Sequence, residues 1–438
     1  MRLSVHGAAH LPRAVRRIAP TLLLTLSLVA GSPASAAEPQ AGGVDPAVIT
    51  TWNANAVATL VQPAPAGAAK VPPEAFLYLS FVHIAMYNAV NGITGEYELY
   101  RWHGKPADGA SPEAAAAAAA HRVLRTYFGA MGTIGADLDA KLAASLALIP
   151  DGAAKNRGVR YGERAADRII ELRANDGRNA VVTVPTATDP GDWEPTPPAM
   201  APFLNPWYGH VDPLAITSPE AFDPGPPPQI GSKRYRKEFA ETRDYGSLVS
   251  SFRTPEQEAT AKFIAEAPLG PMQGGLRRLA MEQGMDISDS ARLFAVTEVS
   301  LADALMAVWH AKHEYMWWRP ITAIRNADSD GDSTTVGVSD WTPLLATPPY
   351  PEWPSGLNAV IGSVTTAAKR LNGGVFDLHL VTPTQGERHY TDVVALRQDG
   401  VNARVWSGIH FRTSDRVSIQ IGRHVAEYVL EHYFRPAD

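Results

Sequence analysis

Cysteine is absent from the whole chain of 438 residues. This absence excludes disulfide bonds, thiolate metal sites and cysteine nucleophiles, so a large hydrophobic core has to stabilise the fold. Basic residues are not in excess either, because 39 Lys and Arg residues stand against 45 Asp and Glu residues, which gives a net charge of -6. Since nucleic-acid-binding surfaces need clustered positive charge, we expect no nucleic-acid partner.

Apolar runs long enough to cross a membrane are missing beyond the N-terminus, because a span needs roughly 18 or more apolar residues. The N-terminus itself has a basic start, an apolar centre over 21–30 and small residues over 34–36. This order is typical of an export signal. We therefore predict a signal peptide over residues 1–36, cleavage after Ala36 or Ala37, and a secreted protein without a membrane span.

Helix signals dominate the chain from about residue 45 to residue 177. Ser111 supplies a helix cap, and the proline and glutamate that follow it are favourable in a first helical turn. The seven alanines 114–120 are strong helix formers and small enough for close packing. A low-complexity linker is the alternative, but an apolar face continues through Leu124, so we predict a packed helix.

Proline, glycine and aromatic residues are concentrated between about 184 and 229. Proline fixes φ and removes a hydrogen-bond donor, so we expect an irregular connection. Large apolar residues such as Trp193, Phe203 and Trp207 are unusual in a flexible linker, which favours an arm packed over the helices. Helical patterns resume near Ser232 and continue to the C-terminus.

These patterns predict an all-α fold with a single mainly helical domain over residues 37–438. The domain should consist of two halves that each resemble a four-helix bundle, joined by the proline-rich irregular arm. Few segments alternate as β-strands do. Extended helical surfaces would also suit a homodimer.

Two cations continue the apolar stripe of a helix that is predicted to begin near Ser288. Lys312 falls at nearly the same helical angle as the buried face, so its side chain should point inward. Arg319 lies two turns later, in front of Pro320, which tends to end a helix. A solvated lysine and an arginine paired with a surface acid are the alternatives, but two tryptophans precede Arg319. We expect both cations to face one cavity.

Two further segments carry polar groups at predicted helix boundaries. Ser355 and Gly356 precede an amphipathic helix, whose start would present free N–H groups and a positive dipole end to an anion. Gly408 gives the backbone freedom between Arg404 and His410, and His410 falls at a loop-to-helix junction. Such a cap or histidine is usually structural when it occurs alone.

Together these segments supply three cations, a hydroxyl, a glycine N–H and an imidazole, which could enclose a tetrahedral oxyanion such as phosphate or vanadate. The order is Lys312, six residues, Arg319-Pro320, then Pro-Ser-Gly, then Arg404, five residues, His410. It resembles the signature of vanadium-dependent haloperoxidases and type 2 phosphatidic-acid phosphatases. Segments 83–90, 193–198 and 341–349 look like the secreted bacterial haloperoxidase branch.

The resemblance implies vanadate as the cofactor, with phosphate as a competing ligand. Lys312, Arg319 and Arg404 would neutralise the equatorial oxygens. Ser355 and the Gly356 N–H would donate hydrogen bonds, and His410 would bind vanadium axially. Hydrogen peroxide and a halide would be the reactants, and Lys312 would polarise the peroxide. In the phosphatase relatives the substrate is a phosphate ester, and the residue matching His410 is the nucleophile.

Leu357 departs from this family pattern, because the resemblance implies a histidine after Pro-Ser-Gly. That histidine is the general acid of the phosphatases and contacts the apical or peroxide oxygen in the haloperoxidases. Losing a general acid costs about 10²–10⁴-fold in rate. Peroxide already carries protons, so we expect haloperoxidase-like activity first, with a phosphatase or a non-catalytic oxyanion-binding protein as alternatives. Other proton donors to consider are His313, Glu314, His379 and His389.

The segment Asp328-Ser-Asp330-Gly-Asp332 spaces its carboxylates as calcium loops do. It lacks the later bidentate glutamate of such loops. We therefore favour a solvated turn after a helix, and calcium binding by the three aspartates stays open.

Overall fold

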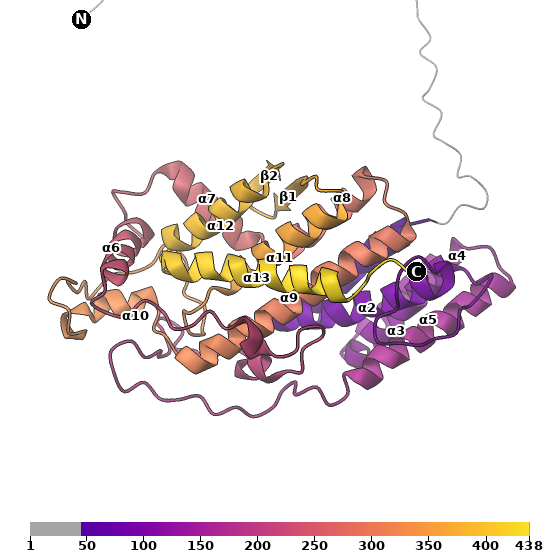
Figure 1. Cartoon of the computed structure of the whole chain (residues 1–438), viewed down its shortest axis with the longest axis horizontal. Helices are drawn as coiled ribbons and strands as arrows, with labels where there is room; N and C mark the ends of the chain where they lie inside the picture. The colour runs from indigo at the N-terminus through magenta and orange to yellow at the C-terminus, as the bar shows by residue number, and fades with distance from the viewer. Residues whose placement is uncertain (1–44, 438) are drawn as a thin grey trace, which may run out of the picture. The chain divides into compact units, whose positions relative to one another are not determined.

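A computed structural model of the protein describes residues 45–437. The predicted signal peptide lies outside the described residues. This part of the chain contains thirteen α-helices, three short 3₁₀ helices and one β-hairpin (Figure 1). The α-helices are α1 (Ala47–Val61), α2 (Glu74–Thr94), α3 (Pro112–Phe128), α4 (Ile134–Ala147), α5 (Ala153–Leu172), α6 (Lys233–Gly246), α7 (Pro255–Glu266), α8 (Gly270–Glu282), α9 (Ile287–Tyr315), α10 (Pro320–Arg325), α11 (Gly356–Leu371), α12 (Val393–Trp406) and α13 (Arg412–His432). The shorter elements are η1 (Pro206–His210), η2 (Pro219–Phe222), η3 (Ala327–Ser329), β1 (Leu378–Thr382) and β2 (Gly386–Tyr390).

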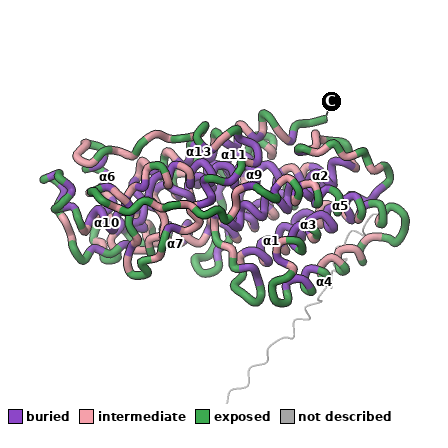
Figure 2. Tube along the Cα trace, turned by 90° about the horizontal axis from the view of Figure 1, so that it is seen from below, coloured by how far each residue is buried: buried purple, intermediate pink, exposed green. Residues whose placement is uncertain are grey.

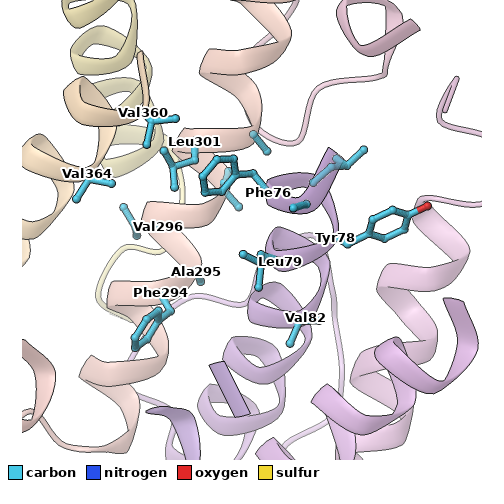
Figure 3. Close-up of a cluster of buried hydrophobic side chains, with 14 of the residues drawn as sticks. Phe76, Tyr78, Leu79, Val82, Phe294, Ala295, Val296, Leu301, Val360 and Val364 are labelled. Atoms are coloured by element: carbon cyan, nitrogen blue, oxygen red, sulfur yellow. The ribbon is translucent and has the colours of Figure 1, made fainter. Parts of the chain in front are cut away.

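The long helix α9 is shared by both halves of the helical core. On one side it packs against α2, which also contacts α1, α3 and α5, and on the other side it packs against α11 and α13. In Figure 3, Leu79 of α2, Leu301 of α9 and Val360 of α11 belong to one cluster of buried side chains. Buried residues are concentrated along these central helices, whereas α4 is largely exposed (Figure 2). The predicted all-α fold is confirmed.

The alanine-rich helix α3 shows why small residues occur there. Ser111 caps it by accepting a hydrogen bond from the Ala114 N–H at 3.1 Å, and the alanines 114–120 are buried. They allow α5 to approach closely, because a Cβ added to Gly162 would come within 2.1 Å of the Ala115 carbonyl oxygen. The predicted packed helix is confirmed, and the linker alternative is wrong.

One helix in the described part of the chain, α2, is long and apolar enough to cross a membrane by length and composition. The expectation that no segment beyond the N-terminus reaches this apolar length was therefore wrong. In the structure, 94% of its apolar window is buried among the other helices. A helix that is buried on all sides needs apolar residues around its whole circumference, which explains the composition of α2.

The proline-rich arm over 184–229 packs against the helices as predicted. Its only regular elements are the short helices η1 and η2. Trp193, Phe203 and Trp207 are buried. Asp303, fully buried on α9, accepts hydrogen bonds of 2.7–2.9 Å from the backbone N–H groups of residues 214–216. These bonds satisfy a buried carboxyl and fix the arm to the central helix.

A β-hairpin of two five-residue strands was not predicted. Strand β1 pairs antiparallel with β2, and Leu378 and Leu380 of β1 are buried against α8. Strands this short give only two or three alternating positions, so they do not stand out in a helical sequence.

The helix that carries Lys312 ends earlier than predicted. α9 stops at Tyr315, and Met316 takes a left-handed φ of 40° while its N–H bonds to the Lys312 carbonyl oxygen. Arg319 is extended and is the N-cap of α10, which Pro320 begins. The predicted continuous helix from Lys312 to Arg319 was wrong. Pro320 begins α10 and does not end α9, because a proline in the first turn of a helix needs no N–H donor.

Candidate active site

The Lys312 side chain is fully buried near the end of α9. Its Nζ donates to the carbonyl oxygens of Pro351 at 2.5 Å and Glu352 at 3.1 Å, and it lies 4.9 Å from the centroid of the Tyr350 ring. Burial lowers the pKa of Lys312 well below its ordinary value, and the positive charge of Arg319 lowers it further. The inward direction predicted from the helical stripe is confirmed.

Arg319 reaches the same place from the other side of the helix break. Its Nε donates to the Tyr350 carbonyl oxygen at 2.7 Å and its Nη1 to the Ile409 carbonyl oxygen at 2.8 Å. Nη2 is buried and has no hydrogen-bond partner within the described part of the chain. Burial lowers the pKa of Arg319 to about 10. Both cations contact Tyr350, so they face one region as expected.

The third cation lies beside the start of α11. Arg404, in the last turn of α12, is 6% exposed, and its Nε is buried without a hydrogen-bond partner among residues 45–437. Ser355 is the N-cap residue of α11 as predicted, but its hydroxyl makes no capping bond. Ser355 Oγ neighbours the Asp415 carboxyl, yet it has no hydrogen bond of normal geometry. Gly356 follows at the first helical position.

His410 is fully buried in the turn between α12 and α13. Gly408, with a φ of 75°, makes that turn possible. His410 Nδ1 lies 2.8 Å from Glu352 Oε1, which also accepts the Phe411 N–H at 3.0 Å. Since Oε1 is an acceptor, the network assigns the proton to Nδ1 and leaves Nε2 unprotonated, as a hydrogen-bond acceptor. Nε2 lies 3.2 Å from Arg319 Nη1.

We call Lys312, Arg319, Ser355, Gly356, Arg404 and His410 the oxyanion cradle. The positive charge of the cradle is only partly neutralised by neighbouring carboxylates. Burial raises the pKa of the neighbouring Glu352 carboxyl to about 7 and that of Asp415 well above its usual range, which weakens both as counter-charges. Burial and then the three cations hold the pKa of His410 well below its ordinary value. Because uncompensated buried charge is unfavourable, the cradle favours an anion.

A pocket of about 450 Å³ opens onto the cradle. Arg404 and Gly356 line it on the cradle side, and Trp309, Tyr350 and Leu357 line it nearby. The anion would therefore be reached through a pocket whose walls are mostly apolar.

Comparisons with known proteins find a match to the part of the chain that contains the cradle. A family model of the VCPO second helical-bundle domain matches residues 292–438, which contain all six cradle residues. This part of the chain is therefore similar to the second helical bundle of that family. Vanadium chloroperoxidase from Curvularia inaequalis is 30% identical over 93 residues, a match that spans 20% of this chain and 15% of that protein.

Solved bacterial vanadium haloperoxidases share the fold over most of the chain. A bacterial vanadium-dependent iodoperoxidase has a TM-score of 0.76 at 22% identity, with 90% of this chain and 98% of that chain covered. A holo-type bacterial vanadium-dependent chloroperoxidase has a TM-score of 0.63 at 17% identity, with 86% and 94% covered. At these identities the likeness extends to the fold, and the chemistry has to be argued from the residues.

The residues of this haloperoxidase fold are suited to hold vanadate. Arg319 Nη2, Arg404 Nε and Ser355 Oγ are buried polar atoms that lack partners in the described structure. Polar atoms in such positions normally find an acceptor, and a tetrahedral oxyanion offers several. His410 Nε2 offers the lone pair that a metal ligand requires.

Leu357 occupies the second position of α11, directly after Gly356. It is half-buried and lines the pocket. An apolar side chain therefore stands where the family resemblance implies an imidazole. The other considered proton donors do not line this pocket: His313 contacts the Thr183 carbonyl oxygen, Glu314 is exposed, and His379 and His389 lie on the hairpin with acidic partners.

Sequence reasoning missed Glu352 and Asp415, the two buried carboxyl groups of the site. Glu352 bonds to His410, and Asp415 Oδ1 accepts from Asn358 Nδ2 at 2.8 Å. A glutamate within an apolar proline-rich stretch just before Pro-Ser-Gly was the available signal for Glu352. Asp415 follows His410 by five residues in the first turn of α13.

The aspartate-rich turn is more buried than predicted. Asp330 and Asp332 are buried, Arg236 forms a 2.6 Å salt bridge with Asp332, and Thr335 donates to Asp330. Only Asp328 is exposed, so the predicted solvated turn was wrong for two of the three residues. Among the described residues, no group of three or more His, Asp or Glu side chains is arranged to hold a metal ion.

Proposed function

We propose that this protein is a vanadate-dependent haloperoxidase-like oxidoreductase that uses hydrogen peroxide to oxidise halide. The observation that carries the proposal is the oxyanion cradle: three buried cations and the Ser355 hydroxyl lie around an imidazole whose Nε2 carries no proton. Lys312, Arg319 and Arg404 would neutralise the oxyanion, Ser355 and the Gly356 N–H would donate to it, and His410 Nε2 would bind the metal.

Different residues of this chain would have different roles in the reaction. Bound vanadate would supply the activation of hydrogen peroxide toward a halide. Glu352 would hold the proton on His410 Nδ1, which keeps Nε2 available. Lys312, whose pKa burial lowers, would regain its proton fully next to the anion and polarise the oxygen that reacts. The pocket walls would exclude water from this region.

Leu357 favours peroxide chemistry over phosphate-ester cleavage. Cleaving an ester with a poor leaving group needs a proton donor, and a leucine cannot supply one. Hydrogen peroxide already carries protons, so the absence of a proton donor at position 357 should slow peroxide chemistry less than it slows ester cleavage. We further propose that the protein acts after export, as its N-terminal sequence predicts.

The test is a halide-oxidation assay with vanadate and hydrogen peroxide, in which iodide is tried first because it is the most easily oxidised of iodide, bromide and chloride. We expect iodide oxidation that phosphate inhibits competitively and that Arg404→Ala abolishes. Leu357→His should raise the rate by up to about 10²-fold, because it restores a proton donor. Phosphate release from a monoester without halide oxidation would favour the phosphatase instead. Oxyanion binding without either turnover would mean a non-catalytic protein.

A further inference from the structure

A groove of about 820 Å³ lies between α6 and the start of α13, where side chains of the two helices are bonded to each other (Figure 1). We call it the basic groove. Within the described part of the chain its lining contains five cationic and two carboxylate side chains. The cations are Lys233, Arg234, Lys237, Arg412 and Arg416, and the carboxylates are Glu238 and Glu241. This local excess of positive charge is not apparent from the net charge of the whole chain, which is -6.

Both carboxylates of the basic groove are already bonded to the first turn of α13. Glu241 accepts three hydrogen bonds of 2.7–3.0 Å from the Arg412 guanidinium. Glu238 is buried and accepts from the backbone N–H of Thr413 at 3.1 Å and from the hydroxyl of the same residue. These bonds fix α6 to α13 and leave little negative charge to neutralise the remaining cations of the groove.

The cations form a row on each of the two helices. Lys233 and Lys237 are four residues apart on α6. Arg412 and Arg416 have the same spacing on α13, so each pair lies on one face of its helix. Lys233, Lys237 and Arg416 are exposed, and none of them has a salt bridge or a side-chain hydrogen bond within residues 45–437. Because like charges repel one another, an anion with several charges would be attracted to this groove.

The lining offers little surface to an aromatic or apolar ligand. Val417 is the one apolar residue, and no aromatic residue lines the groove in the described structure. The bases of single-stranded nucleic acids are held by stacking on aromatic side chains, which are missing here. A flat anionic bilayer cannot enter a groove. Phosphate groups fit the lining better, because arginine donates two parallel hydrogen bonds to phosphate oxygens and lysine binds them as a point charge.

We propose that the basic groove binds a linear polyphosphate, which is a flexible chain of consecutive phosphate groups without an organic part. Cations on both walls can contact such a chain at several phosphates together, and linked contacts of this kind raise the affinity above that for a single phosphate. The basic groove shares no lining residue with the pocket that opens onto the oxyanion cradle. The site is therefore additional to the proposed haloperoxidase centre and does not rest on it.

The test is a calorimetric titration of the full chain with a short linear polyphosphate. Orthophosphate is kept constant in every titration, so that the cradle is already occupied. We expect polyphosphate to bind, and its affinity should fall by roughly tenfold or more between about 50 mM and about 200 mM salt, because binding of a polyanion to cations releases counterions.

A double variant isolates the basic groove. Lys237→Ala with Arg416→Ala removes one cation from each wall, and it should weaken polyphosphate binding by about fivefold to tenfold at low salt. It should also reduce the slope of log affinity against log salt by about 1.4, since each lost contact contributes about 0.7. Lys369→Ala with Arg370→Ala is the matched control: both residues are exposed near the end of α11 and lie outside the groove lining, so neither quantity should change. Thermal unfolding checks that each variant is folded.

An oligothymidylate with the same number of phosphates tests the class of ligand. It should bind about tenfold more weakly than polyphosphate, because its charges are less dense and its bases find no aromatic side chain to stack on. Equal or tighter binding of the oligothymidylate would overturn the polyphosphate assignment in favour of a nucleic-acid site. Absence of polyphosphate binding, or binding that the groove variant leaves unchanged, would overturn the proposal outright. Neither result bears on the haloperoxidase proposal, since the groove variant leaves all six cradle residues in place.

Discussion

His410 depends on a buried carboxyl group for its orientation. Glu352 Oε1 accepts from His410 Nδ1 and from the Phe411 N–H, so one oxygen fixes both the imidazole and the start of α13. Partners that hold a metal ligand in this way influence metal affinity although they do not touch the metal. Glu352 is therefore a positioning residue in the proposed site.

Replacing Glu352 with glutamine tests this role. We predict that Glu352→Gln weakens vanadate binding by about 10–100-fold, the usual effect of altering such a partner, because an amide oxygen accepts the Nδ1 proton more weakly than a carboxylate does. Phosphate forms no bond to an imidazole in this site and would lose a neighbouring negative charge, so its affinity should not fall. The measurement is the ratio of vanadate to phosphate affinity by calorimetry. An unchanged ratio would contradict the positioning role, and a thermal unfolding scan would detect a merely misfolded variant.

At the level of elements, the site is built from helix ends. α9, α10, α11 and α12 each contribute a cradle residue at or near a terminus, and His410 lies in the turn before α13. Helix termini leave backbone groups unpaired, and the start of α11 itself contains two cradle residues, Ser355 and Gly356. The turn at Gly408 allows the side chains of Arg404 and His410 to lie in the same site.

Gly408→Ala should separate backbone strain from site geometry. Its φ of 75° is unfavourable for alanine, and the new Cβ would come within 2.4 Å of the Gly246 carbonyl oxygen. The left-handed conformation alone costs about 1–2 kcal/mol. We predict a lower unfolding temperature and at least about tenfold weaker phosphate binding.

Gly374→Ala is the matched control for that change. Gly374 also has a positive φ, of 88°, but a Cβ there meets nothing within 4 Å. It should lower the unfolding temperature without changing phosphate affinity. Retention of full phosphate affinity by Gly408→Ala would mean that the turn does not set the geometry of the site.

The helices and most cradle residues could be predicted because helical periodicity and capping residues are local signals. Ser111 and the alanines after it identified α3 correctly, and the stripe ending at Lys312 gave its inward direction. The break at Met316 could not be predicted, because a left-handed methionine has no local signature and depends on contacts with the arm. Glu352 was missed for a related reason: its partners lie about 60 residues later and meet it only after folding.

At the scale of the whole molecule, a second buried polar cluster affects stability. Glu298 of α9 is fully buried, and its Oε1 accepts from Gln273 Nε2 at 2.5 Å. Gln273 in turn accepts from Asn53, which also contacts His83. Burial raises the pKa of Glu298 from 4.5 to about 8.

The raised pKa gives a definite sign for the pH dependence of stability. A folded-state pKa above the unfolded value means that the stabilising contribution of the protonated carboxyl is complete below about pH 4.5 and is lost as the pH rises to about 8. Glu298→Gln keeps the acceptor for Gln273 but cannot ionise. We predict that the free energy of unfolding falls more between pH 5 and pH 8 in the unmodified protein than in the variant, by an amount on the order of a few kcal/mol. The measurement is the free energy of unfolding from urea denaturation at each pH. An equal change with pH in the unmodified protein and in Glu298→Gln would contradict the prediction.

The most direct test of the cradle is a titration of the protein with orthovanadate, with phosphate as competitor. We predict competitive binding that Arg404→Ala weakens by about 10–100-fold, since a charged hydrogen bond contributes roughly 1.5–3 kcal/mol. Arg160→Ala, which removes the same charge from the exposed surface of α5, should bind as the unmodified protein does. Vanadate binding that phosphate does not displace, or that Arg404→Ala leaves unchanged, would contradict the proposed oxyanion site.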